Sequence, residues 1–210
     1  MSKAIMISIH PKWCKKIADG EKTIEVRKTR PKIDTPFKCY IYCTKDKPIM
    51  GRWFDERGYI SFESCNEEDF DCYNQNIFFR ANGKVIGEFV CDGILSRCES
   101  SNADMAEIYG CIKREQLFEY SQGKELYGWY ISDLVIYDKP KELSEFYIID
   151  KQAVKECGLR ERIYTNPDYT NGVCLPGTYV CKQKYDFCRG GCWKKSLSRP
   201  PQSWCYVEEL

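Results

Sequence analysis

Charged side chains crowd one short segment near the start of the chain, "DGEKTIEVRKTRP", which runs from Asp19 to Pro31. Lys22 and Arg27 in this segment suit a phosphate or a carboxylate, because an ammonium and a guanidinium both donate to anions, the guanidinium bidentately. Glu25 between them would stay ionised, and could accept a hydrogen bond from the exocyclic amine of cytosine or adenine or act as a general base. The alternative interpretation is an ordinary surface ion pair, worth under about 1 kcal/mol.

Three further residues are candidates for the same site. His10, the only histidine, precedes a predicted helix and either reaches the cleft, caps the helix or packs in the core. Ser203 and Trp204 follow a Pro-Pro turn, and they would form one lip of the cleft if their strand pairs beside the charged segment. Aromatic rings could stack on a base, although at strand spacing they more often belong to the core. The rings considered in this way are Tyr40, Tyr42, Trp129 and Trp204.

The charged segment follows a strand and a helix in the predicted order of elements. "KAIMISI" is a largely apolar run typical of a strand, and a helix is expected from Pro11, where proline suits the first turn, to a stop at Gly20. In the next strand Ile24 and Val26 alternate with Glu25 and Arg27, so that the charged pair shares one face. Lys22 can share their cleft only if it lies in the turn before that strand.

The rest of the chain predicts an α+β fold built on a small barrel. Further strands are expected at "FKCYIYCT", "GKVIGEFVCDGILSR" and "LYGWYISDLVIYDKP", with two helices between Ser101 and Gly123. Residues 1–150 form the predicted main domain, in which 50–76 is an acidic surface insertion with a possible hairpin at "WFDERGYISF". Residues 151–210 form a Cys-rich extension whose last strand, at about 203–209, is expected to rejoin the main sheet.

Charge and cysteine content restrict the environment and the partners. The net charge is +1, but Met1–Pro48 carries +7 and Asp55–Cys72 carries −6, which favours a local positive surface that meets phosphates. No segment has the apolar length of a signal peptide or a membrane span, so a cytoplasmic protein without a membrane partner is expected.

In the cytoplasm, most of the 14 cysteines would be buried thiols. Four thiols in the extension could instead hold a structural zinc: Cys174, Cys181, Cys188 and Cys192.

The charged segment resembles the signature G-x-K-x-x-E-x-R of the ASCH family, here Gly20, Lys22, Glu25 and Arg27. The stretches "GKVIGEFVCDGI" and "YGWYISDLVIYDKPKELSEF" are similar to the strands that follow in that family, so the resemblance covers about Met1–Tyr147 and the last strand. The whole pattern, including the closing "RPPQSWCYVEEL", looks like ASCH proteins of phages or mobile elements of gut bacteria. The resemblance implies a PUA-like barrel with flanking helices and a cleft beside the signature.

The resemblance also implies a binding module for RNA or a modified nucleotide, with Thr23 joining the other candidates at the cleft. An alternative is a hydrolase in the same cleft, an N4-acylcytidine amidohydrolase or a ribonuclease, with Lys22 and Glu25 as catalytic residues. In the amidohydrolase a Thr stands three residues after the Lys, and here Glu25 takes that place. A third hypothesis is a protein-interaction factor that uses the acidic insertion. No cofactor is required by any of these hypotheses, and the oligomeric state is left open.

Overall fold

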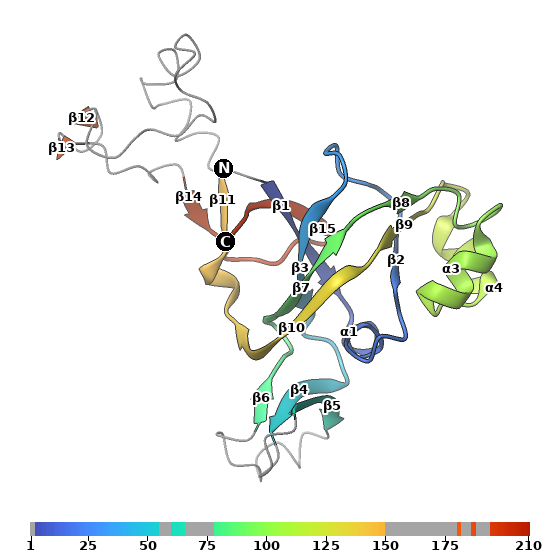
Figure 1. Cartoon of the computed structure of the whole chain (residues 1–210), viewed down its shortest axis with the longest axis horizontal. Coiled ribbons are helices and arrows are strands. Elements are labelled where there is room, and N and C mark those ends of the chain that lie inside the picture. Colours follow the sequence, from blue (N-terminus) through green and yellow to red (C-terminus); the bar gives the residue numbers. More distant parts are fainter. Residues whose placement is uncertain (1–2, 55–59, 66–77, 150–179, 182–185, 188–193) are drawn as a thin grey trace.

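The computed structural model describes residues 3–54, 60–65, 78–149, 180–181, 186–187 and 194–210. A five-stranded sheet with the order β10-β7-β3-β1-β15 forms the centre of the fold (Figure 1). Its strands in chain order are β1 (Lys3–Ile9), β3 (Phe37–Cys43), β7 (Val85–Cys91), β10 (Ser132–Lys141) and β15 (Trp204–Glu208). β1 runs parallel to β3 and antiparallel to β15, and all of it except Lys3 is buried. The apolar run "KAIMISI" is therefore a strand covered on both faces, as such runs are.

A second sheet has the order β2-β9-β8, and it carries the charged segment. Its strands are β2 (Ile24–Arg27), β8 (Ile94–Leu95) and β9 (Tyr127–Tyr130). The predicted closed barrel is wrong, because the described strands form separate open sheets. "LYGWYISDLVIYDKP" was expected to be one strand, but it forms β9 in this sheet and β10 in the central sheet, with Asp133 in the left-handed region at φ 47°. The chain therefore changes sheets near Ile131 instead of closing a single one.

Three α-helices in the described ranges flank these sheets. α1 (Pro11–Ala18) buries Cys14 and Ile17 against the central sheet, and the chain leaves it through Gly20 at φ +76°. α3 (Ala103–Gly110) and α4 (Arg114–Ser121) lie together beside the second sheet, at the far right of Figure 1. Their buried residues share a core with Ile24 and Val26 of β2. One face of β2 thus packs on helices, which leaves its charged face for the cleft.

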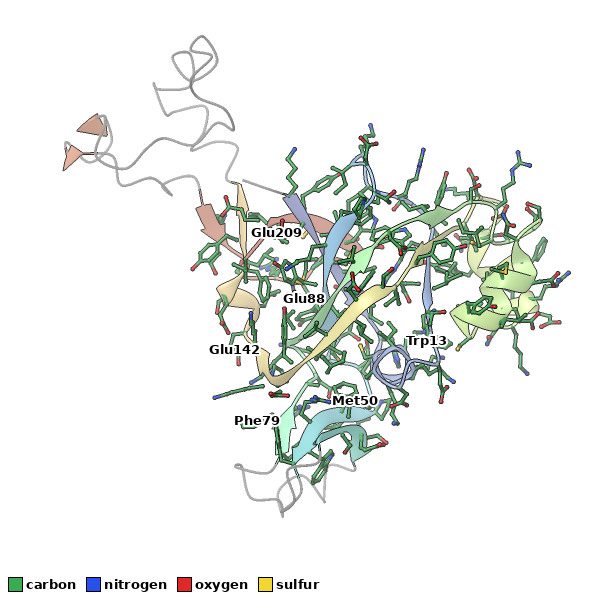
Figure 2. The ribbon with its side chains drawn as sticks, in the orientation of Figure 1. Trp13, Met50, Phe79, Glu88, Glu142 and Glu209 are labelled. Atoms are coloured by element: carbon green, nitrogen blue, oxygen red, sulfur yellow. The ribbon has the colours of Figure 1, made fainter. Side chains whose placement is uncertain are left out.

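The expected acidic insertion is described only in part. The predicted hairpin is formed by β4 (Ile49–Phe54) and β5 (Ile60–Cys65), and β6 (Phe78–Arg80) pairs with the other edge of β4. This small sheet extends from the body at the lower end of Figure 2, where Met50 and Phe79 are labelled. Residues 55–59 and 66–77 lie outside the described residues, and the interaction-factor hypothesis stays a prediction.

The end of the chain returns to the central sheet through β15. Before it, β11 (Tyr147–Ile149) pairs antiparallel with β14 (Lys194–Ser196) after a short 3-10 helix at Leu143–Glu145. The described parts of the extension between them are β12 (Val180–Cys181) and β13 (Asp186–Phe187). No helix in the described ranges is long and apolar enough to cross a membrane.

Five of the eight cysteines expected to be buried thiols are buried: Cys14, Cys39, Cys43, Cys91 and Cys98. Cys111 is only half-buried, because it follows α3 in a left-handed conformation at φ 55° and lies at the surface, where its thiol donates to Glu21 O. The side chains of Cys65 and Cys72 are not described. Tyr40, Tyr42 and Trp129 are core residues, which excludes them as stacking platforms.

Candidate functional site

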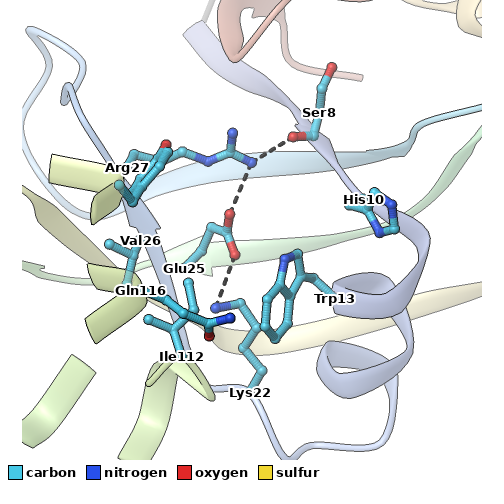
Figure 3. A pocket seen from close by; sticks show the side chains of 10 residues that line it. Ser8, His10, Trp13, Lys22, Glu25, Val26, Arg27, Ile112 and Gln116 are labelled. Carbon is cyan, nitrogen blue, oxygen red and sulfur yellow. Dashed lines mark hydrogen bonds and ion pairs between the residues drawn. The ribbon is translucent and has the colours of Figure 1, made fainter. Parts of the chain in front are cut away.

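A cleft with a volume of about 360 Å³ opens between α1, β2 and α4. This volume lies within the range of small-molecule sites in proteins, about 300–1,000 Å³. Its lining residues are Ser8, His10, Trp13, Lys22, Glu25, Val26, Arg27, Ile112, Gln116 and Tyr120. Figure 3 shows Lys22, Glu25 and Arg27 in a chain of contacts across its floor, with Trp13 on one side and Ile112 and Gln116 on the other.

Lys22 lies in the turn before β2, the position that a shared cleft requires. Its side chain is almost fully buried, and its ammonium donates to Ile24 O at 2.8 Å and Gly110 O at 2.6 Å. The Glu25 carboxylate is 3.3 Å from the same nitrogen. An ammonium has three hydrogens. Two of them are donated to the backbone carbonyls, while Glu25 Oε2 is an ion-pair partner without a hydrogen bond of normal geometry. Lys22 therefore pairs with Glu25 and holds the end of α3 in place, and two of its three hydrogens are already used by backbone carbonyls.

Glu25 is 6% exposed and lies between the two cations. Its Oε1 is 2.9 Å from the Arg27 guanidinium, and its Oε2 faces the Lys22 ammonium. Oε2 has no hydrogen-bond donor among the described residues that meets normal geometry. A buried carboxylate oxygen normally has such a donor. Glu25 thus lines the cleft with a carboxylate that is held between two cations and whose buried Oε2 is incompletely satisfied.

Arg27 connects the cleft to the central sheet. One terminal nitrogen donates to Ser8 O on β1 at 2.6 Å (Figure 3). The other approaches Ser203 Oγ at 3.4 Å. Ser8 Oγ in turn donates to Pro201 O at 2.6 Å. The Nε of Arg27 has no acceptor in the described part of the chain. The segment before β15 therefore helps to hold Arg27, and the guanidinium keeps one buried N–H without an acceptor.

Aromatic and amide side chains form the walls of the cleft. Trp13 on α1 is half-buried, and the Lys22 ammonium lies 5.2 Å from its ring centroid. On the opposite side α4 presents Gln116 and Tyr120, four residues apart and so on one helix face. Burial raises the pKa of Tyr120 above its usual value, so its hydroxyl is neutral at pH 7. A flat ligand would meet rings and a neutral amide at the sides, and charges at the floor.

The other predicted site residues lie in different places. His10 lines the cleft and also caps α1, where its Nδ1 accepts from Lys12 N at 3.3 Å. Ser203 contacts Arg27 but does not line the cleft. Trp204 packs on Trp129 at 5.9 Å between centroids and does not line it either. Thr23 is exposed and is not among the lining residues.

Several lining residues were not among the sequence candidates. Ser8 is the one polar residue in an otherwise apolar run after Lys3, which is a usable signal for a strand position that faces a site. Gln116 and Tyr120 at helical spacing carry a weaker signal. Trp13 on α1 contacts both the core and the cleft.

The proposed zinc ligands cannot be assembled from the described residues. Cys174, Cys188 and Cys192 lie outside them, and Cys181 belongs to β12, where only the backbone is described. In the described ranges no three His, Cys, Asp or Glu side chains gather as metal ligands would. The structural zinc stays a prediction.

The chain belongs to the ASCH domain family, whose family model matches residues 7–146. ASCH domains are in general nucleic-acid-binding modules with a PUA-like fold. The predicted family is therefore confirmed, while the origin in a phage or mobile element stays a prediction.

Three solved structures are similar to this chain. One is ASCH from Zymomonas mobilis, with 15% identity, a TM-score of 0.47, and coverage of 98% of this chain and 88% of that one. A serine-to-alanine mutant of that protein gives 16% identity, a TM-score of 0.44, and coverage of 98% and 89%. A tyrosine-to-phenylalanine mutant gives 17%, a TM-score of 0.39, and coverage of 81% and 87%. A search of curated proteins finds no match.

Proposed function

We propose that the cleft binds a nucleotide, either within RNA or carrying a modified base. The observation that carries this proposal is the carboxylate of Glu25, which belongs to the lining of a cleft of nucleotide size and whose buried Oε2 lacks a normal donor. Cytosine and adenine present an exocyclic amine on the base edge, and such an amine would donate to this oxygen. The Trp13 ring beside it offers a surface on which a base can stack.

The positive charge of the floor supports the same ligand class. Lys22 and Arg27 carry two positive charges against the single negative charge of Glu25, so the floor has an excess of one positive charge. Arg27 is the member with donor capacity left for a phosphate or a sugar oxygen. Lys22 contributes through the electrostatic field of its ammonium and by positioning Glu25.

Hydrolysis of an N4-acylcytidine or a phosphodiester is the second candidate, because Oε2 of Glu25 could also accept a proton from water. Lys22 donates two hydrogens to backbone carbonyls and is paired with Glu25, so its ammonium would have to shift in order to stabilise developing negative charge. Thr23 lies outside the cleft and could not act as a nucleophile there. These two observations favour binding over hydrolysis.

Calorimetric titration with cytidine and uridine monophosphates tests the proposal, because the two ligands differ by an amine against a carbonyl at one ring position. We expect cytidine monophosphate to bind at least about tenfold more tightly, the selectivity of one good base-edge hydrogen bond. Glu25→Gln should remove most of that selectivity, and Trp13→Ala should weaken both ligands. Glu63→Gln, an exposed carboxylate paired with Lys15, is the control.

The same samples, with N4-acetylcytidine added to the panel, are analysed by mass spectrometry for products. Turnover by the wild-type protein that is lost in Glu25→Gln would show that the protein is a hydrolase instead of a binding module. Failure of the wild-type protein to bind any member of the panel would overturn both functions.

A further inference from the structure

The loop that follows β2 continues the positive charge of the cleft floor along the surface. Its sequence from Arg27 to Lys32 is "RKTRPK", which holds four basic residues and no acid. Arg27 belongs to the cleft, Lys28 is half-buried, and Arg30 and Lys32 are exposed. None of Lys28, Arg30 and Lys32 forms an ion pair with an acidic side chain in the described part of the chain. Their charge is therefore available to a partner.

Each step of this loop lies against an aromatic ring. The Lys28 ammonium is 4.8 Å from the centroid of Tyr120, and the Arg30 guanidinium is 5.9 Å from that of Tyr127. Farther along, Lys32 N donates to the Tyr206 hydroxyl at 2.7 Å. We call Lys28, Arg30, Lys32, Tyr120, Tyr127 and Tyr206 the cation–aromatic track.

The track is continuous with the cleft and is held in place. Tyr120 lines the cleft, and Tyr127 is the cross-strand partner of Arg27. Trp204 donates from its indole nitrogen to Thr29 Oγ1 at 3.0 Å, which attaches the middle of the loop to β15. The loop joins β2 to β3 at the upper edge of Figure 1. A ligand chain that leaves the cleft beside Arg27 would therefore meet the track first.

From this alternation of cations and rings we infer that the track binds single-stranded nucleic acid, taking about three nucleotides next to the one in the cleft. Exposed rings stack on bases of any sequence, and the cations between them follow the phosphates. A duplex keeps its base faces stacked inside, and an acidic peptide has no flat groups to place on tyrosines. Tyr120 and Tyr206, both 37% exposed, are accessible for such contacts. The inference rests on the proposed function, because the cleft nucleotide is taken as one member of the strand.

The test compares a labelled tetracytidylate RNA with cytidine monophosphate by fluorescence anisotropy and competition. We expect the tetranucleotide to bind at least about tenfold more tightly than the mononucleotide, since stacking and phosphate contacts add to the cleft. Arg30→Ala/Lys32→Ala should remove most of this gain and leave the affinity for the mononucleotide unchanged. It should also reduce the slope of log K against log salt by about 1.4, or about 0.7 for each lost contact with a single strand.

A matched control removes two exposed lysines elsewhere, Lys45→Ala/Lys139→Ala, with the same change in net charge. Tyr206→Leu removes one ring without a charge and should weaken only the tetranucleotide. Three outcomes would each overturn the track. The two double variants could weaken tetranucleotide binding equally, or the tetranucleotide could bind no more tightly than the mononucleotide. A duplex or polyglutamate could also compete as well as the single strand. If cytidine monophosphate does not bind but the track variant still weakens the tetranucleotide, the proposed function fails and the track stands.

Discussion

At the residue scale, the buried charges of the cleft are held mainly by one another. Lys22 is a buried cation whose contacts are Glu25 and two backbone carbonyls. Lys16 forms a superficially similar pair with Glu21, but at the exposed surface. The two lysines thus offer a matched comparison of a buried and an exposed ion pair.

Lys22→Met should lower the free energy of unfolding by about 3–5 kcal/mol, because it leaves buried acceptors without their donor. Urea unfolding followed by far-UV circular dichroism measures this loss. Lys16→Met should leave the urea midpoint close to that of the wild type, since exposed ion pairs contribute little. Equal midpoints for Lys22→Met and the wild type would contradict the structural role given to Lys22.

The sequence was sufficient to place Glu25 and Arg27 on one face, because alternation along a strand is a local property. It also gave the condition under which Lys22 could join them, and the structure meets that condition. Gln116 and Tyr120 could not be assigned, because their place in the cleft depends on how a distant helix packs on β2. Ser8 and Gly110 contribute backbone carbonyls, and no residue type signals such a contribution.

At the element scale, Glu88 on β7 connects three strands. It accepts from Tyr137 on β10 at 2.5 Å and from Lys38 on β3 at 2.9 Å. Partial burial raises the pKa of Glu88, but the hydrogen bonds from Tyr137 and Lys38 outweigh it and lower the pKa below the usual 4.5. A lowered pKa in the folded state stabilises the protein above pH 4.5, and this contribution is lost as the pH falls through the folded value.

Tyr137→Phe should therefore cost about 1 kcal/mol at pH 7, after allowance for the partial exposure of Glu88. The difference from the wild type should shrink as the pH falls from 5 to 3, as urea titrations at several pH values would show. Tyr40→Phe is the control, because the Tyr40 hydroxyl accepts from the neutral Leu210 N–H at 2.8 Å. A Tyr137→Phe effect that is independent of pH would contradict the role of Glu88.

Gly87 sits where β7 meets β10, and this glycine is required by close packing of two backbones. A Cβ on Gly87 would clash with the carbonyl oxygen of Val135, an atom that cannot move aside as a side chain could. Gly87→Ala should cost about 1–3 kcal/mol, as overpacking does. Gly93→Ala, where the nearest atom is Tyr130 Cδ2 at 3.2 Å, should cost less. Thermal unfolding of the two variants side by side makes the comparison.

A glycine within a strand pattern, such as Gly87, is itself a signal of a bulge or a close backbone approach, whereas no local signal marks the change of sheet near Ile131. "LYGWYISDLVIYDKP" contains no glycine or proline at the point of the change, and its β-branched and aromatic residues favour a strand on both sides. The position of the break between β9 and β10 depends on which strand each half pairs with, and this is a tertiary property. The prediction of a closed barrel was wrong for the same reason.

At the scale of the whole molecule, the chain between β11 and β14 is predicted to be dispensable for the cleft. Ile149 and Lys194 are direct cross-strand partners, so the ends of the intervening chain are as close as neighbours in a hairpin. The described residues that line the cleft all come from other parts of the chain. Replacement of residues 150–193 by an Asn-Gly turn, which suits a two-residue hairpin, should preserve cytidine monophosphate binding within about twofold.

The same variant tests the metal prediction, because it removes all four proposed zinc ligands: Cys174, Cys181, Cys188 and Cys192. Purified wild-type protein should contain about one zinc per chain by elemental analysis, and the shortened protein should contain none. Loss of nucleotide binding in the shortened protein, with the fold retained, would show that the extension contributes to the cleft. A metal that binds only the folded state must raise its stability. The structural zinc would therefore be excluded if the purified wild-type protein contains no zinc and its thermal midpoint does not change when zinc or a chelator is added.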